Sequence, residues 1–183
     1  INDSLFDDAL TRRLANKTIG DKVDTVRDCL ANLETLCRHG HFSLEIQLSA
    51  VRELLASLGE AHSAWNLVRC LQRDGIPAKL VDLTGWSDAK DLTLDERIYH
   101  AFKDLEINAC VPIVTGYARS EQGLVSQFDR GYSEMTFSRI AVITGASEAI
   151  IHKEYHLSSA DPRIVGVEQV VPIGRTNYDV ADQ

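Results

Sequence analysis

The apolar residues of this chain change their spacing near residue 77, and this change limits the folds that the chain can adopt. From Lys22 to His39 they recur every three or four residues, and the stretches 44–55 and 61–71 repeat the pattern, with residues 57–60 separating the two. Such spacing places apolar side chains on one face of an α-helix. Residues 1–76 are therefore predicted to be the mainly helical portion of the chain.

Beyond residue 77, short apolar runs alternate with helical patterns. The predicted strands are 77–83, 111–115, 123–128 and 149–152, and the predicted helices are 95–105 and 133–144. Strands that alternate with helices favour a mostly parallel sheet covered by helices on both faces, which is a three-layer α/β sandwich. The expected fold class is thus α/β, with a helical N-terminal half and a sheet-containing portion at 77–183.

Charge and hydropathy narrow the range of partners. The net charge of −8 argues against a basic surface for nucleic acid. The sequence has no signal peptide and no run of about 18 apolar residues, so we expect a cytoplasmic protein without membrane contact. Cysteine and histidine spacings match no metal motif, and no protein-bound metal is predicted.

The two ends of the sequence are those expected of an interior segment. The chain begins with Ile1, and it stops soon after residues 176–179, whose spacing is typical of a capping box that starts a helix. We therefore expect these 183 residues to be part of a longer protein.

A glycine-containing turn at 128–134 lies between a predicted strand and a predicted helix. The unpaired N–H groups at such a helix start bind anions, and Arg130 adds a planar fork for a carboxylate or phosphate. The alternative is that Ser133 caps the helix and Arg130 is an ordinary surface residue.

Three other short segments are candidates for ligand binding. Glu60 lies beside a glycine at a predicted helix start, where it either binds an amino group or complements the helix dipole. The turn at Asp161 and Pro162 presents Arg163, although an ordinary turn has the same pattern. Gly116, just after a predicted strand, permits close approach of a ligand to the backbone.

Taken in order, these segments resemble the aspartate kinases of the amino-acid kinase superfamily over residues 40–183. The family motifs are Ser-x-Gly-Glu, Thr-Gly-Phe, Gly-Arg-Gly-Gly-Ser-Asp and Thr-x-Asp-Pro-Arg. Their counterparts here are residues 57–60, 115–117, 129–134 and 159–163. The resemblance implies an enzyme that transfers the γ-phosphoryl group of ATP, with Mg²⁺, to the β-carboxylate of L-aspartate.

Site residues follow from the resemblance by position. Glu60 is expected to bind the substrate ammonium group, Arg130 the substrate carboxylate, and Ser133 to lie beside it. The residues expected at the nucleotide are Arg163, Ser158 and Lys153. L-aspartate and ATP are thus the expected small-molecule partners, and a homo-oligomer is expected.

Several positions depart from the family pattern. Tyr132 replaces the second glycine, Glu134 replaces the aspartate, and residues 151–153 replace Trp-Thr-Asp. The segments 82–86, 128–134 and 152–162 resemble the divergent aspartate kinases associated with ectoine biosynthesis. These departures keep two alternatives open: a kinase for another small carboxylate or carbamate, and a binding or regulatory protein without turnover.

Two parts of the family are missing from the sequence. The Lys-x-Gly-Gly-Thr-Ser segment, whose lysine is expected to be catalytic, has no counterpart in residues 1–20, and the C-terminal ACT domains are absent. Residues 1–183 alone are therefore expected to have little or no kinase activity.

Overall fold

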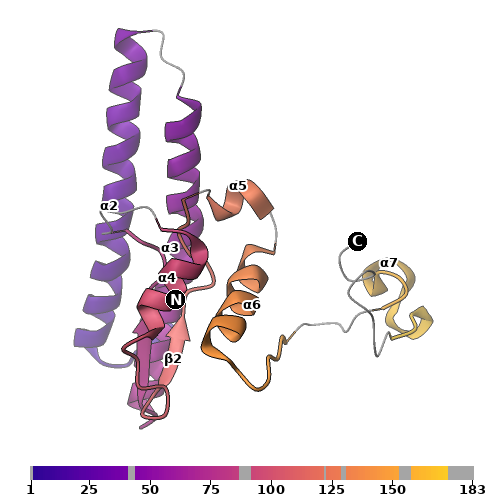
Figure 1. Ribbon diagram of the computed structural model, residues 1–183. Coiled ribbons are helices and arrows are strands. Elements are labelled where there is room, and N and C mark those ends of the chain that lie inside the picture. Colours follow the sequence, from indigo (N-terminus) through magenta and orange to yellow (C-terminus); the bar gives the residue numbers. More distant parts are fainter. Residues whose placement is uncertain are drawn as a thin grey trace. The chain divides into compact units, whose positions relative to one another are not determined.

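The computed structural model describes residues 2–40, 44–86, 92–121, 123–128, 131–152 and 158–172. The chain divides into two units, residues 1–147 and residues 148–183, which are considered separately here. The first unit contains a long helical hairpin, a small parallel sheet and shorter helices around it (Figure 1).

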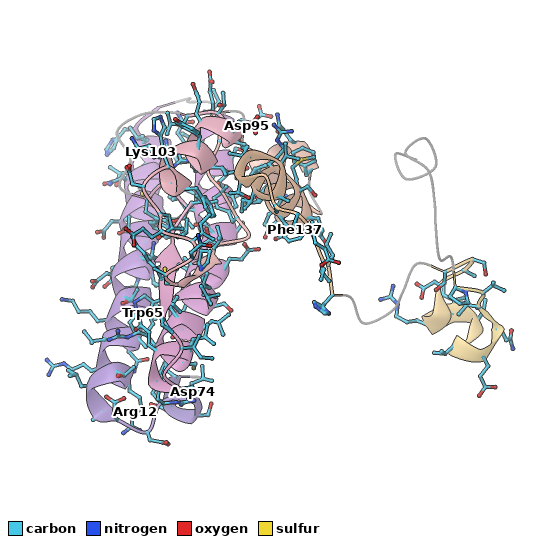
Figure 2. All side chains as sticks on the ribbon, turned by 60° about the horizontal axis from the view of Figure 1, so that its bottom comes forward. Arg12, Trp65, Asp74, Asp95, Lys103 and Phe137 are labelled. Carbon is cyan, nitrogen blue, oxygen red and sulfur yellow. The ribbon has the colours of Figure 1, made fainter. Side chains whose placement is uncertain are left out.

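The helical hairpin consists of α2 (Ala9–His39) and α3 (Glu45–Arg73), preceded by the short α1 (Asn2–Leu5). Asp8 caps α2 by accepting the N–H of Thr11 at 2.7 Å. Trp65, labelled in Figure 2, packs edge-to-face on Phe6 with ring centroids 6.3 Å apart. The helical first portion is confirmed. Neither long helix, nor any other helix in the described ranges, is apolar enough over its length to cross a membrane.

Helix α3 runs without interruption through residues 57–60, where the sequence predicted a break. Gly59 has open space around its Cα and is accommodated at a cost of about 1 kcal/mol. The buried residues Val51, Ala61 and Val68 continue one apolar face across the predicted break. Packing of this face outweighs the glycine, and Glu60 consequently lies in the interior of α3 rather than at a helix start.

The sheet pairs β1 (Ala78–Val81) with β2 (Val111–Val114) in parallel, with Ala78 opposite Val111 and Val81 opposite Val114. Helix α4 (Leu94–Phe102) provides the crossover that a parallel pair requires, and α3 packs against both strands. The predicted α/β class with a parallel sheet is confirmed. Because the strands are parallel, the segments that follow them emerge at the same edge.

Helix α4 begins with a capping box. The Thr93 hydroxyl accepts the N–H of Glu96, and the Glu96 carboxylate accepts the N–H of Thr93 at 3.0 Å. These two bonds satisfy backbone donors that a helix start otherwise leaves open.

We expect Thr93→Ala to lower the free energy of unfolding by about 1 kcal/mol, the usual value of such a cap. Thr93→Ser, which keeps the hydroxyl, should lose much less. Hydrogen bonds from Thr93 lower the pKa of Glu96. The stabilisation from the ionised Glu96 carboxylate in the capping box is therefore present above the ordinary pKa of a glutamate, and it fades as the pH falls. Equal urea-unfolding curves for the alanine variant and the parent at neutral pH would contradict the assignment.

Residues 124–128 form helix α5 (Leu124–Phe128), so the prediction of a strand at 123–128 is wrong. Leu124 and Val125 are buried in the core cluster although they lie on a short helix, and adjacent buried apolar side chains also occur in strands. Helix α6 (Tyr132–Thr144) confirms the prediction for 133–144. Its N-cap is Gly131, with φ of 82°, and not Ser133.

The core lies where the loops after β1 and β2 meet α4, α5 and α6. Its members are Val81, Leu83, Ile98, Phe102, Tyr117, Ala118, Leu124 and Val125. At the rim of this core, Asp95 of α4 faces α6 (Figure 2), and Arg139 Nε donates to Asp95 Oδ1 at 2.8 Å. Sheet, loops and helices thus share one packed centre.

The second unit contains α7 (Pro162–Val165), a short 3₁₀ helix (Val167–Gln169) and an antiparallel bridge between Ser158 and Pro172. Residues 149–152 form neither helix nor strand and are exposed, so the prediction of a buried strand there is wrong. An apolar pair such as Ile150 and Ile151 does not by itself distinguish a buried strand from an exposed irregular segment. The predicted capping box at 176–179 lies outside the described residues.

Candidate substrate-binding site

Glu60, Gly116 and Ser133 come together from three separate elements. The Ser133 hydroxyl, at the start of α6, donates to Glu60 Oε1 in the middle of α3 at 3.0 Å. Gly116, two residues after β2, lies so close that an added Cβ would be 2.6 Å from Glu60 Oε2 and 2.8 Å from Ser133 Oγ. Only glycine fits between these side chains as they stand.

The second carboxylate oxygen of Glu60 is the chemically distinctive atom of this cluster. Glu60 Oε2 is buried and has no hydrogen-bond partner among the residues that the structure describes. A buried acceptor left unpaired is costly, and such atoms in native proteins commonly await a ligand or water. Nearby, the first N–H groups of α6 form the positive end of that helix. A negative atom beside a positive helix end suits a small zwitterion.

Three residues on one face of α3, Glu53, Ser57 and Glu60, each accept a hydrogen bond from a different segment. We refer to them as the α3 stripe. The donors are Tyr117 to Glu53 at 2.7 Å, Trp86 to Ser57 at 2.9 Å, and Ser133 to Glu60 at 3.0 Å. Glu53 was not singled out from the sequence, and Ser57 and Trp86 appeared there only within the motifs 57–60 and 82–86, without a role. Polar residues four and seven positions apart on a helix that packs on a sheet were a usable signal.

The Thr115 side chain links, through hydrogen bonds, the two segments that follow β1 and β2. Its hydroxyl accepts the N–H of Leu83 at 3.0 Å and donates to the carbonyl of Tyr117 at 2.8 Å. Its side chain is 1% exposed. The threonine before Gly116 therefore supports the site by fixing backbone rather than by facing a ligand.

Two tyrosines, Tyr117 and Tyr132, have raised pKa values because of burial and of the glutamates of the stripe. Burial, together with the hydrogen bond to Glu53, raises the pKa of Tyr117 far above its ordinary value. Burial also raises the pKa of Tyr132, and the charge and hydrogen bonding of Glu60 raise it further. The rings meet edge-to-face with centroids 6.1 Å apart. Both phenols are therefore protonated, and able to donate, at neutral pH.

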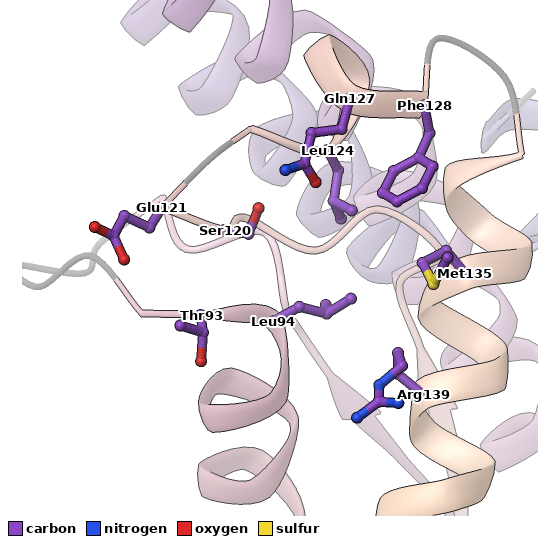
Figure 3. A pocket seen from close by; sticks show the side chains of 9 residues that line it. All are labelled: Thr93, Leu94, Ser120, Glu121, Leu124, Gln127, Phe128, Met135 and Arg139. Carbon is purple, nitrogen blue, oxygen red and sulfur yellow. The ribbon is translucent and has the colours of Figure 1, made fainter.

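One cavity adjoins the α3 stripe, and another adjoins the cluster of Glu60, Gly116 and Ser133. One, of about 740 Å³, is lined by Ser57 and Tyr117 among others, and another, of about 470 Å³, is lined by Gly116 and Ser133. Their volumes lie in the range typical of small-molecule sites. A smaller cavity of about 160 Å³ lies between α4, α5 and α6 (Figure 3), where it includes none of the predicted site residues.

The remaining predicted site residues are placed elsewhere or not described. Arg130 and Lys153 lie outside the described residues. Arg163 and Ser158 belong to the second unit, where the Arg163 guanidinium bonds Asp161 Oδ2 at 2.9 Å and lowers the pKa of that carboxyl. Of the predicted set, the structure thus brings together Glu60 and Ser133. Within the described ranges, no group of three or more His, Cys, Asp or Glu side chains is arranged to hold a metal ion.

The chain belongs to the amino acid kinase family, whose sequence profile matches residues 8–183. It is 50% identical over 182 residues to "Aspartate kinase Ask_Ect" of Stutzerimonas stutzeri (strain A1501), covering 100% of this chain and 38% of that protein. It is 30% identical over 132 residues to "Aspartokinase" of Schizosaccharomyces pombe (strain 972 / ATCC 24843), covering 67% of this chain and 25% of that protein. No solved structure gives a significant match. The chain therefore spans well under half the length of both relatives.

Proposed function

We propose that the full-length protein is an ATP-dependent kinase that phosphorylates the β-carboxylate of L-aspartate to give 4-phospho-L-aspartate. The 50% identity to an aspartate kinase over the whole of this chain supports the reaction class. The segments at 82–86, 128–134 and 152–162 further favour the subgroup of aspartate kinases associated with ectoine biosynthesis.

The observation that carries the proposal is the buried, unpaired Oε2 of Glu60 beside the start of α6. An α-ammonium group is a natural partner for a buried carboxylate oxygen, because a charge-assisted hydrogen bond offsets the cost of burying both charges. The positive end of α6, which begins two residues after Arg130 in the sequence, suits the α-carboxylate of the same substrate. A substrate without an amino group would leave Oε2 unpaired.

The proposed roles of the residues follow. Glu60 binds the substrate ammonium group, Arg130 binds its carboxylate, and Ser133 orients the Glu60 carboxylate from the start of α6. The residues proposed at the ATP phosphates are Arg163, Ser158 and Lys153. Mg²⁺ is proposed to enter with ATP, because this ion is commonly bound through nucleotide phosphates, water and few protein ligands.

The test uses the full-length protein, because this chain matches only 38% of the aspartate kinase from Stutzerimonas stutzeri. ADP release is measured with L-aspartate, L-glutamate, succinate and carbamate as acceptors, and hydroxamate trapping identifies the acyl phosphate. Turnover that depends on L-aspartate supports the proposal. Preference for an acceptor without an amino group would overturn it. Calorimetric binding of L-aspartate and ATP without turnover would favour a regulatory protein, a reading motivated by Tyr132 in the usual glycine position.

We expect Glu60→Gln to lower kcat/KM for L-aspartate by about 100-fold, or about 2.7 kcal/mol, because a neutral amide cannot pair with the ammonium charge. Glu34→Gln removes the same charge from an exposed position on α2, where Glu34 pairs with Arg38, and should leave the kinetics unchanged. A parental kcat/KM in the Glu60 variant would show that this carboxylate does not bind substrate.

Other expectations stay predictions. These are a homo-oligomeric state, a cytoplasmic location, the division of the kinase domain near residue 77, and the inactivity of residues 1–183 alone.

A further inference from the structure

We propose that Lys22 of α2 is a positioning residue that holds the segment 82–86 against α3 and thereby shapes the substrate site beside Glu60. This inference rests on the proposed function. It gives a role to a segment that so far has none, and to a lysine that lies outside the family motifs. Segment 82–86 directly follows β1, at the edge of a parallel sheet where ligands commonly bind.

The amine of Lys22 contacts both ends of this segment. Lys22 Nζ lies 3.9 Å from Asp82 Oδ2, at the first position of the segment, and 4.5 Å from the centre of the Trp86 ring, at its last position. The first contact is an ion pair and the second is a cation–π contact. Burial of the amine lowers the pKa of Lys22, and the negative charge of Asp82 opposes that shift. Removal of the lysine charge therefore weakens the attachment of both ends to α2.

Hydrogen bonds inside the segment make its two ends one unit. Asp82 Oδ1 accepts both the N–H of Thr84, at 2.9 Å, and the Thr84 hydroxyl, while Oδ2 of the same carboxylate faces Lys22. Gly85 follows with φ of 64°, a left-handed conformation that glycine adopts without strain. The carboxylate that pairs with Lys22 thus also fixes the turn that leads to the end of the segment.

Trp86 joins the segment to the α3 stripe. Its indole N–H donates to Ser57 Oγ at 2.9 Å, and Ser57, which is fully buried, lies three residues before Glu60 on the same helix. Ser57 and Thr84 both line the cavity of about 740 Å³. Lys22 therefore acts on the site through the segment, because it holds the ring whose hydrogen bond fixes the segment to the stripe.

A positioning role and a purely structural role predict different results. A lysine that only stabilises the fold changes the free energy of unfolding and leaves the kinetics of the folded protein unaltered. A lysine that positions segment 82–86 changes the binding of L-aspartate in protein that is still folded. Because Glu60 is placed at the ammonium group and not at the reacting carboxylate, the effect should fall on KM for L-aspartate rather than on kcat.

The test is Lys22→Met in the full-length protein, which removes the charge and keeps most of the length of the side chain. We expect KM for L-aspartate to rise about fivefold, with kcat within about twofold of the parent and KM for ATP unchanged. Lys22→Arg keeps a cation over the Trp86 ring and should restore KM to within about twofold of the parent. Lys17→Met, at an exposed position on the same helix, is the matched control and should change none of these values.

Two further variants test the route of the effect. Asp82→Asn keeps an acceptor for Thr84 and removes the charge that faces Lys22, so it should raise KM for L-aspartate in the same direction. Trp86→Phe removes the indole N–H that bonds to Ser57. If Lys22 acts through this bond, Lys22→Met should raise KM by less than about twofold in the Trp86→Phe background, so that the two effects are not additive.

Urea unfolding of every variant is measured alongside the kinetics. The inference is overturned by a parental KM for L-aspartate in Lys22→Met or in Asp82→Asn, by an arginine variant as poor as the methionine variant, or by additive effects of Lys22→Met and Trp86→Phe. Calorimetric binding of L-aspartate to the parent and to the Lys22 variants is measured in parallel. A parent protein that binds L-aspartate without phosphorylating it overturns the proposed function, while the binding constants still decide the role of Lys22. A parent that does not bind L-aspartate overturns both.

Discussion

Gly116→Ala is expected to reduce kcat/KM for L-aspartate by about 100-fold, the scale that a displacement of about 1 Å in a site can produce. The added Cβ would lie 2.6 Å from Glu60 Oε2 and 2.8 Å from Ser133 Oγ, closer than side-chain atoms approach one another. Both of these atoms end side chains and can move away, whereas Ser133 Cβ, 3.1 Å from the added Cβ, must shift by a few tenths of an ångström. The φ angle of Gly116 is not in the left-handed region, so alanine adds no backbone strain.

The Gly116 variant thus displaces Glu60 without removing its charge, and the stability of the protein should change little. Gly20→Ala on α2 is a matched control, because an added Cβ there meets nothing within 4 Å. Steady-state kinetics with L-aspartate and urea unfolding of both variants separate activity from stability. A Gly116 variant with parental kcat/KM would mean that this close contact has no part in substrate binding.

The second large effect is expected on stability. Thr115→Val should lower the free energy of unfolding by about 2–6 kcal/mol, because the buried N–H of Leu83 and the carbonyl of Tyr117 both lose their partner, at about 1–3 kcal/mol each. Valine has nearly the shape of threonine, so the packing around position 115 is retained and the loss comes from the two unpaired backbone groups.

Thr115→Ser keeps the hydroxyl and separates this effect from the loss of a methyl group. We expect it to cost much less than the valine substitution in urea unfolding followed by the fluorescence of Trp65 and Trp86. The opposite order, with valine tolerated and serine costly, would mean that the methyl group and not the hydroxyl holds the two segments together.

Much of the secondary structure could be predicted because it follows from apolar spacing alone. The helices near 22–39, 95–105 and 133–144 and the strands near 77–83 and 111–115 were recovered in this way. The errors arose where tertiary packing decides the outcome. Gly59 indicated a helix end, but the buried face of α3 continues past it. The adjacent apolar residues Leu124 and Val125 indicated a strand, although they are buried in the core on a short helix.

For the site, the sequence could predict which residues take part, but not which side chains contact one another. Glu60 and Ser133 were found because ordered motifs resemble those of a known family, and the structure places these two side chains in contact. Nothing local in the sequence indicates that Trp86 reaches Ser57, or that Tyr117 reaches Glu53, 64 positions away in the chain. Such contacts depend on the register of the sheet against α3, which only the folded chain defines.

The α3 stripe has a consequence for how such a chain tolerates insertions and deletions. Its three side chains reach their hydrogen-bond donors only when they lie on the same face of α3, because successive residues of an α-helix are rotated by about 100°. One residue added or lost between Glu53 and Glu60 would turn Glu60 away from Ser133 while leaving Glu53 on Tyr117. The length of α3 in this stretch is therefore fixed by the geometry of three hydrogen bonds.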